Sequence, residues 1–169
     1  MFQVNPGIFV VESPCEMLYL VDGNNLMAQT PGWHRDRSAA KKRLLLELAV
    51  LVSARKVRVR VVFDGAPDDE FPEGCVYRSV RVHYARTGSD ADSRIREMVE
   101  QSTSPRDMAV VTSDKPLGSR VKQMGVQVIL SGTFRRMLQE AATAKSEKPG
   151  DREPIDVAEW LKIFEDSKS

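Results

Sequence analysis

The segment MLYLVDGNNL (residues 17–26) joins a run of apolar residues to an aspartate and a turn. Its first five residues are apolar at consecutive positions, which is typical of a strand that is covered on both faces. Similar runs recur at residues 57–63, 108–112 and 126–130. Helix-like patterns lie between these runs, so we expect an α/β fold with a central, mostly parallel sheet.

The helix-like patterns consist of apolar residues three or four positions apart. Residues 76–85 instead alternate apolar and polar side chains, and we expect them to form an edge strand. The three helical patterns are built on Leu44, Leu45, Leu48, Leu51 and Val52; on Ile95, Met98 and Val99; and on Leu117, Val121 and Met124 before Gly125.

Composition excludes several classes of protein. The 169 residues include 25 Lys plus Arg and 24 Asp plus Glu, so the net charge of +1 argues against a strongly basic, histone-like binder. The two cysteines, Cys15 and Cys75, are far apart and form no CxxC pair, so they predict no zinc site. The first residues resemble neither a signal peptide nor a membrane anchor, and we expect a cytoplasmic protein.

Aspartates follow the predicted strands at the points where these strands end. Asp22, Asp64 and Asp114 each come at or just after a strand, while Asp90 and Asp92 lie at the start of a predicted helix. The carboxyl ends of parallel strands meet at one rim, so these carboxylates should converge. Their mutual repulsion favours a cation, and an all-oxygen ligand set suits Mg²⁺ or Mn²⁺.

Each of these aspartates also has a purely structural interpretation. An aspartate after a strand is often a helix N-cap or a turn former, and the DGAPDD segment makes a turn a serious alternative for Asp64. Asp90 is suited to cap a helix, and Asp92 to favour the helix dipole. The coincidence of several strand-end aspartates in one domain favours a functional site.

The segments MLYLVDGNNL, RVVFDG, YARTGSDADSRIREMV and AVVTSDKPLGSRVKQMGVQVILSGTF occur in this order. Together they resemble the YacP-like branch of the NYN domains, within the PIN-like nuclease superfamily, over roughly residues 17–140. The resemblance implies a three-layer α/β/α, Rossmann-like domain with a site for a divalent metal and endoribonuclease activity.

The resemblance assigns roles position by position. Asp22, Asp92 and Asp114 match the acids of the family's site and would be both catalytic and metal-binding, with Asp64 and Asp90 as auxiliary ligands. Asn25 matches an asparagine that supports the substrate or the geometry of the site. Asn24 occupies a position that is commonly aromatic in the family, so a stacking role there is in doubt.

RNA contacts are expected along the basic region that follows the DGNN loop and beside Asp114. A solvated helix surface is the alternative for the basic region, and salt-bridged surface is the alternative for a positive rim at Arg78, Arg81, His83 and Arg86. The predicted RNA-binding residues are Arg35, Lys41, Lys42, Arg43, Ser113 and Lys115.

The chain is expected to divide into an N-terminal extension (1–16), the nuclease-like domain (17–141), a linker (142–153) and a C-terminal docking helix and tail (154–169). The leading hypothesis is a metal-dependent endoribonuclease. The alternative is an RNA-binding module with little or no catalysis, acting in a ribosome- or RNA-associated complex. A phosphatase of the haloacid dehalogenase type is disfavoured, because Asn24 stands where its second aspartate is needed. The oligomeric state stays open.

Overall fold

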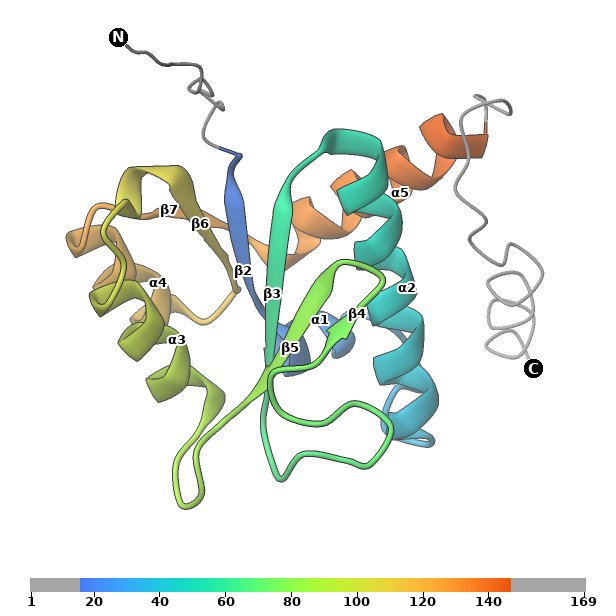
Figure 1. The fold of residues 1–169 in the computed structure, drawn as a ribbon, viewed down its shortest axis with the longest axis horizontal. Helices are drawn as coiled ribbons and strands as arrows, with labels where there is room; N and C mark the ends of the chain where they lie inside the picture. Colours follow the sequence, from blue (N-terminus) through green and yellow to red (C-terminus); the bar gives the residue numbers. More distant parts are fainter. Residues whose placement is uncertain (1–15, 147–169) are drawn as a thin grey trace, which may run out of the picture.

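Six strands form one sheet in the order β4-β5-β3-β2-β6-β7 (Figure 1). The structure is a computed structural model that describes residues 16–146. Five of the strands run parallel, and only β4 pairs antiparallel with its neighbour β5. The strands are β2 (Leu18–Asp22), β3 (Arg58–Phe63), β4 (Val76–Tyr77), β5 (Val80–Tyr84), β6 (Met108–Val111) and β7 (Gln127–Ile129).

Helices cover both faces of the sheet and give the domain three layers (Figure 1). Helices α1, α2 and α5 pack on one face, whereas α3 and α4 pack on the other. The mostly parallel α/β fold expected from the sequence is therefore confirmed. The helices are α1 (Gly23–Met27), α2 (Arg37–Arg55), α3 (Ala91–Glu100), α4 (Lys115–Gln123) and α5 (Ser131–Ser146), with a short 3₁₀ helix, η2, at Pro105–Asp107.

The burial of the central strands explains their continuous apolar runs. In β2, Leu20 belongs to the core beneath α3 and α4, and its neighbour Val21 belongs to the core beneath α2 and α5. In β3, Val61 and Val62 divide in the same way. Side chains alternate between the two faces of a strand, so a strand with helices on both sides needs apolar residues at every position.

Residues 76–85 form a hairpin, so the expectation of a single edge strand is wrong. Arg78 and Ser79 have positive φ angles of 48° and 73°, and the chain reverses there between β4 and β5. Left-handed conformations at both central positions are typical of a two-residue hairpin turn. Neither residue is a glycine or an asparagine, so no turn was expected at this point. β5 therefore lies inside the sheet beside β3, and β4 is the edge strand.

Helix α5 continues through Ser146, past the predicted start of the linker at residue 142. Arg135 of α5 binds to two other helices of the domain. Its Nη1 contacts Glu47 Oε1 of α2 at 2.8 Å, and its Nη2 donates to the Leu26 carbonyl of α1 at 3.1 Å. The rest of the predicted linker and the predicted docking helix lie outside the described residues, as does nearly all of the predicted N-terminal extension. Among residues 16–146, no helix has the length and apolar character that crossing a bilayer requires.

Candidate active site

Asp22 is the last residue of β2 and the N-cap of α1. Its carboxylate accepts hydrogen bonds from the Asn25 backbone N–H at 3.4 Å and from Thr112 Oγ1 at 3.2 Å. The residue is only 9% exposed. With so few donors, this buried carboxylate does not replace the hydrogen bonds to water that it loses on folding.

The electrostatic surroundings of Asp22 follow from this burial. Burial raises the pKa of Asp22 to about 6, against the lowering effect of the hydrogen bonds from Asn25 and Thr112. The negative charges of Asp64 and Asp92 raise it further. The aspartates at the ends of β2 and β3 and at the start of α3 therefore act on one another across the rim of the sheet.

Asp92 and Asp114 form the second part of this rim. Asp92 lies in the first turn of α3, and its pKa is raised by burial and then by the charges of Asp114 and Asp90. Asp114 caps α4 by accepting from the Leu117 N–H at 3.1 Å. Its own N–H donates to Thr112 Oγ1 at 3.1 Å, so Thr112 links Asp114 to Asp22. Asp22, Asp64, Asp92 and Asp114 are called the aspartate rim below.

Asp64 connects three elements at the same edge. Its Oδ1 accepts from the Ala91 N–H, at the first turn of α3, at 2.7 Å. Its N–H donates to Asn24 Oδ1 of α1 at 2.8 Å. Asn24 thus has a structural role: it holds the end of β3 against α1.

Asp90 lies beside the rim, and its carboxylate serves as a helix cap. It caps α3, with Oδ1 accepting from the Ser93 N–H at 2.9 Å, and this hydrogen bond lowers the pKa of Asp90. Asp90 is exposed, and the structural role considered for it from the sequence is the one seen here. A role as an auxiliary metal ligand stays a prediction.

Asn25 is fixed by two neighbours from other elements. Its Oδ1 accepts from the Ser113 N–H at 2.9 Å and from Ser131 Oγ at 2.5 Å. Ser131 also donates its own N–H to Ser113 Oγ at 3.1 Å. The Ser113 N–H is an obligatory donor, so it determines which end of the Asn25 amide is the oxygen and leaves Nδ2 as a donor.

Sequence reasoning missed Ser131, a fully buried residue at the start of α5. The only signal was that a serine follows a predicted strand and precedes an apolar helical pattern, which marks a helix start. Its contact with Asn25 spans 106 positions in sequence, and no local pattern predicts a contact at that range.

The rim fits a hard divalent cation by its chemistry, since its ligands are all carboxylate oxygens. Within residues 16–146, however, no group of three or more His, Cys, Asp or Glu side chains is arranged closely enough to hold a metal ion. Mg²⁺ in proteins is commonly held by one or two carboxylates and completes its coordination with water. The rim therefore fits an ion with few direct protein ligands.

The predicted RNA-binding residues are found in different surroundings. Lys41 contacts Asp68 Oδ2 at 2.7 Å and Tyr84 Oη at 3.2 Å, and its side chain is only 14% exposed. Its position therefore supports a structural role in anchoring the loop after β3. Lys42 lies 3.8 Å from Glu70, and Arg43 is partly buried. Arg35, Ser113 and Lys115 are exposed, and RNA contact at these positions stays a prediction.

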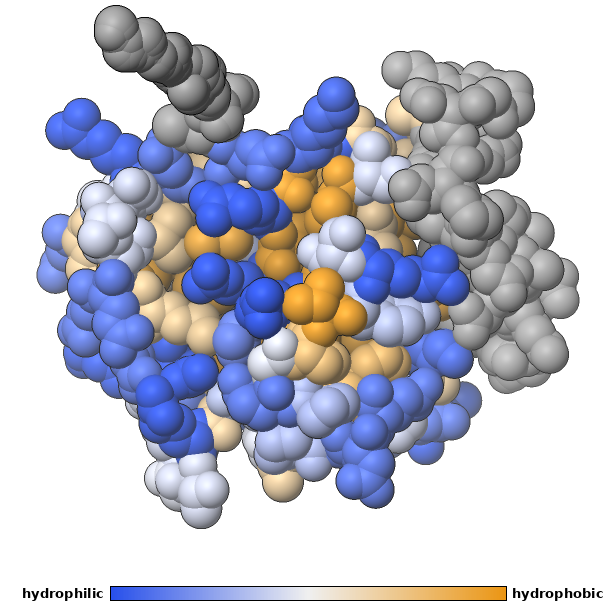
Figure 2. Space-filling model, viewed as in Figure 1, coloured by the Kyte–Doolittle hydropathy of each residue, from blue (hydrophilic) through white to orange (hydrophobic). Residues whose placement is uncertain are grey.

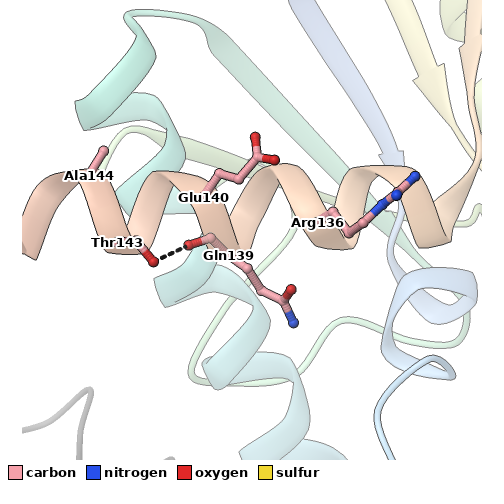
Figure 3. Close-up of a pocket in the computed structure, with 5 residues that line it drawn as sticks. All are labelled: Arg136, Gln139, Glu140, Thr143 and Ala144. Atoms are coloured by element: carbon pink, nitrogen blue, oxygen red, sulfur yellow. Dashed lines mark hydrogen bonds between the residues drawn. The ribbon is translucent and has the colours of Figure 1, made fainter.

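A cavity of about 460 Å³ lies along the outer surface of α5, away from the rim. Figure 3 shows the residues that line it within the described part of the chain, Arg136, Gln139, Glu140, Thr143 and Ala144, which belong to α5. Thr143 Oγ1 satisfies its hydrogen bond within the helix, on the Gln139 carbonyl, at 3.1 Å. The cavity contains none of the rim residues and is separate from the candidate site.

The sheet, with helices on both faces and the aspartate rim at one edge, has the α/β fold of a PIN-like domain. The family model for the YacP-like NYN domain matches residues 19–162. The chain therefore belongs to the YacP-like NYN domain family, which is part of a nuclease superfamily.

Two crystal structures of Rae1 (YacP) from Bacillus subtilis are similar to this fold. A mutant form matches with a TM-score of 0.67 and 18% identity, covering 90% of this chain and 90% of that chain. A second structure matches with a TM-score of 0.59 and 22% identity, covering 89% of this chain and 94% of that chain. No curated protein matches the sequence.

Proposed function

We propose that the protein is a divalent-metal-dependent endoribonuclease whose active site is the aspartate rim. The observation that carries this proposal is the electrostatic coupling of Asp22, Asp64, Asp92 and Asp114 at the carboxyl ends of the strands. Membership of a nuclease superfamily supports the reaction class. Mutually repelling carboxylates at a ligand-binding edge are costly to maintain, and a bound cation offsets that cost.

Of Asp22, Asp92 and Asp114, one or two would hold the cation directly and the others through its water ligands, with Asp64 beside them. When bound, the cation lowers the pKa of a water molecule and neutralises charge on the phosphodiester. Asp22 is the most buried of the four, and the two hydrogen bonds that it accepts are long, at 3.4 Å and 3.2 Å. Asp114 and Asp64 each use one oxygen to bind the start of a helix, which fixes their direction and leaves the second oxygen for the site.

Asn25 is the proposed substrate-orienting residue. Ser113 and Ser131 occupy its oxygen, so its Nδ2 is presented as a donor whose direction is fixed. Such a donor suits a phosphate or ribose oxygen of RNA. Lys115, which is exposed and directly follows Asp114, is placed to attract the same polyanion.

Cleavage of structured and unstructured RNA tests the proposal. We expect the wild-type protein to cut with Mn²⁺ and to stop with chelator, and the double variant Asp22→Asn/Asp92→Asn to lose at least about 100-fold in rate. Asp69→Asn is the matched control, since Asp69 is an exposed carboxylate in the loop after β3 and outside the rim. Cleavage that survives chelator, or that survives the double substitution, contradicts the assignment.

Asp90→Asn separates capping from metal binding. Asparagine caps a helix about as well as aspartate but carries no charge. Cleavage within about twofold of the wild type identifies Asp90 as a cap, whereas a loss close to that of Asp92→Asn identifies it as part of the metal site.

A second function is an RNA-binding module with little or no catalysis that acts in a ribosome- or RNA-associated complex. One observation favours it: no set of three metal-capable side chains is closely grouped among the described residues. RNA binding that persists in Asp22→Asn/Asp92→Asn, together with no cutting by the wild type under any divalent metal, selects this function.

A further inference from the structure

One face of β3 and β5 carries arginines that the helices on that side leave accessible. On this side of the sheet, α3 packs on β2 and β3, and α4 packs on β7. Arg58 and Arg81 are exposed and Arg60 is half-buried. Figure 2 shows strongly hydrophilic residues interspersed with apolar ones at the centre of the molecule. Arg58, Arg60 and Arg81 are called the arginine face below.

The sheet register places these arginines together. Arg60 is directly opposite Arg81 in the parallel pairing of β3 and β5. Arg58 lies two residues before Arg60 and therefore on the same face, about 7 Å along the strand. The arginine face is thus a compact row of three cations on a rigid support.

Among residues 16–146, no salt bridge joins this row to a carboxylate. The charged groups that act on Arg60 are Arg58 and Arg81, both cations. Arg58 and Arg81 donate to the backbone carbonyls of Glu16 and Gly74, at 3.3 Å and 2.9 Å. These bonds fix the two guanidinium groups without cancelling their charge.

Two carboxylates of the same surface, Glu73 and Glu97, are already occupied. Glu73 accepts from His83 Nδ1 at 2.8 Å and lies 3.6 Å from Arg94 Nη2, and Glu97 contacts both Arg94 and Arg86. This part of the surface is salt-bridged, as the alternative for His83 and Arg86 suggested. Within the described part of the chain, the arginine face therefore keeps its positive charge.

The arginine face lies on the same sheet as the aspartate rim but is separated from it on β3 by Val62, which is buried beneath α3. Arg60 and Arg81 each precede the last residue of their strand, Phe63 or Tyr84, by three positions, which is about 10 Å. Asp64 of the rim follows Phe63 directly. A polyanion that leaves the rim at Asp64 would therefore pass around the start of α3 before it met Arg60 and Arg81 and then Arg58.

We propose that the arginine face binds the phosphate backbone of single-stranded RNA beyond the cleavage site. The choice of RNA as the ligand rests on the proposed function. The binding chemistry does not, because the arginine face and the aspartate rim consist of different residues. Guanidinium groups bind phosphate oxygens in a bidentate manner. The arginine face contains no aromatic side chain on which a base could stack, so we expect binding there to be independent of base sequence.

Binding of a fluorescent single-stranded RNA of about 16 nucleotides, near the upper end of single-strand site sizes, tests the proposal. The full chain is used with chelator, so that cleavage does not interfere. For Arg60→Gln/Arg81→Gln we expect an affinity for RNA about tenfold weaker than that of the wild type. The slope of log K against log salt concentration should be smaller by about 1.4, since each lost phosphate contact removes about 0.7. Arg60→Lys/Arg81→Lys keeps both charges and should retain most of the slope.

Arg106→Gln/Arg136→Gln is the matched control, because it removes two exposed arginines from η2 and α5. Thermal melting of each variant verifies folding. Equal loss of affinity in the control pair, or an unchanged slope in Arg60→Gln/Arg81→Gln, overturns the proposal. Poly-glutamate is the second probe: if the substitutions weaken its binding but leave RNA binding unchanged, the face serves an acidic protein partner and the proposal is wrong. Failure of the nuclease assignment would instead appear in cleavage by the Asp22→Asn/Asp92→Asn protein.

Discussion

The aspartates at the strand ends share a residue type but have different environments. Asp90 is exposed and uses its carboxylate as a helix cap, so its ionised form is favoured. Asp22 is buried beside other negative charges, so its ionised form is disfavoured. Strongly perturbed carboxylates in a rim of this kind are typical of functional sites, because a bound cation relieves their repulsion at a pH where they are ionised.

This difference predicts that Asp22 destabilises the metal-free protein. Its pKa rises from 3.8 to about 6 on folding, so stability falls as the pH rises from 3.8 to about 6 and the full cost is present at pH 7. In chelator, Asp22→Asn should raise the free energy of unfolding by about 1–3 kcal/mol at pH 7. Near pH 4 the gain should be small. Urea unfolding at both pH values measures it.

Asp69→Asn, at an exposed carboxylate outside the rim, should change stability by less than about 0.5 kcal/mol at either pH. A gain of equal size at pH 7 and pH 4 for Asp22→Asn would show that the effect is not electrostatic.

At the scale of single residues, the sequence predicted the positions of the strand-end aspartates well. Asp22, Asp64 and Asp114 follow apolar runs, and such runs identify buried strands without knowledge of the rest of the chain. Lys41 was predicted to contact RNA, but it pairs with Asp68 and Tyr84. These contacts join segments 27 and 43 positions apart, and helix periodicity alone does not reveal them.

At the scale of elements, α1 positions the site because it lies tightly against β3. Gly23 makes this approach possible: a Cβ atom at this position would lie 2.5 Å from the Phe63 ring and 3.0 Å from Val61. The neighbouring Asn24 and Asn25 reach the ends of β3 and β6 from this position. The glycine in DGNN is therefore required for packing, in addition to any role in the turn.

Gly23→Ala should lower the free energy of unfolding by about 1–3 kcal/mol, because the added methyl group overpacks the contact with Phe63. Cleavage should fall with it, since Asp22 and Asn25 are attached to the displaced helix. Gly132→Ala in α5 is the matched control: a Cβ atom there would meet no described neighbour within 4 Å, and alanine should add about 0.4–1 kcal/mol. Equal effects of the two substitutions in urea unfolding would refute this account of α1.

The order of the elements was predicted more reliably than their ends. Hydrophobic periodicity predicted the parallel core, but it treated residues 76–85 as one strand because Arg78 and Ser79 carry no turn signature. It also placed the start of the linker at residue 142, inside α5.

At the scale of the whole molecule, charge is separated by position. The net charge of +1 combines an acidic rim at the carboxyl ends of the strands with an arginine face on the sheet beside it. An enzyme that binds both a cation and a polyanion needs regions of each sign. The overall composition excluded only uniformly basic binders, because it does not show how charges are distributed on the folded surface.

Binding of a divalent cation at the rim should stabilise the entire domain. At a free Mn²⁺ concentration of about 100 times the dissociation constant, the gain is about 2.7 kcal/mol. For a chain of this size that corresponds to a rise of about 5–10 °C in Tm. Differential scanning calorimetry of the wild type and of Asp69→Asn should show the rise, and Asp22→Asn/Asp92→Asn should not. An equal rise in the double variant would place the metal elsewhere.

The contact of Asn25 with Ser131 has a consequence for synthesis of the protein. The two residues are 106 positions apart, so the ribosome needs roughly 5–20 s after adding Asn25 before it adds Ser131. Throughout that interval the Asn25 amide lacks its contact with Ser131. A nascent chain therefore carries Asp22 and Asn25 well before the proposed site is complete, and the site can be assembled only when most of the domain has been synthesised.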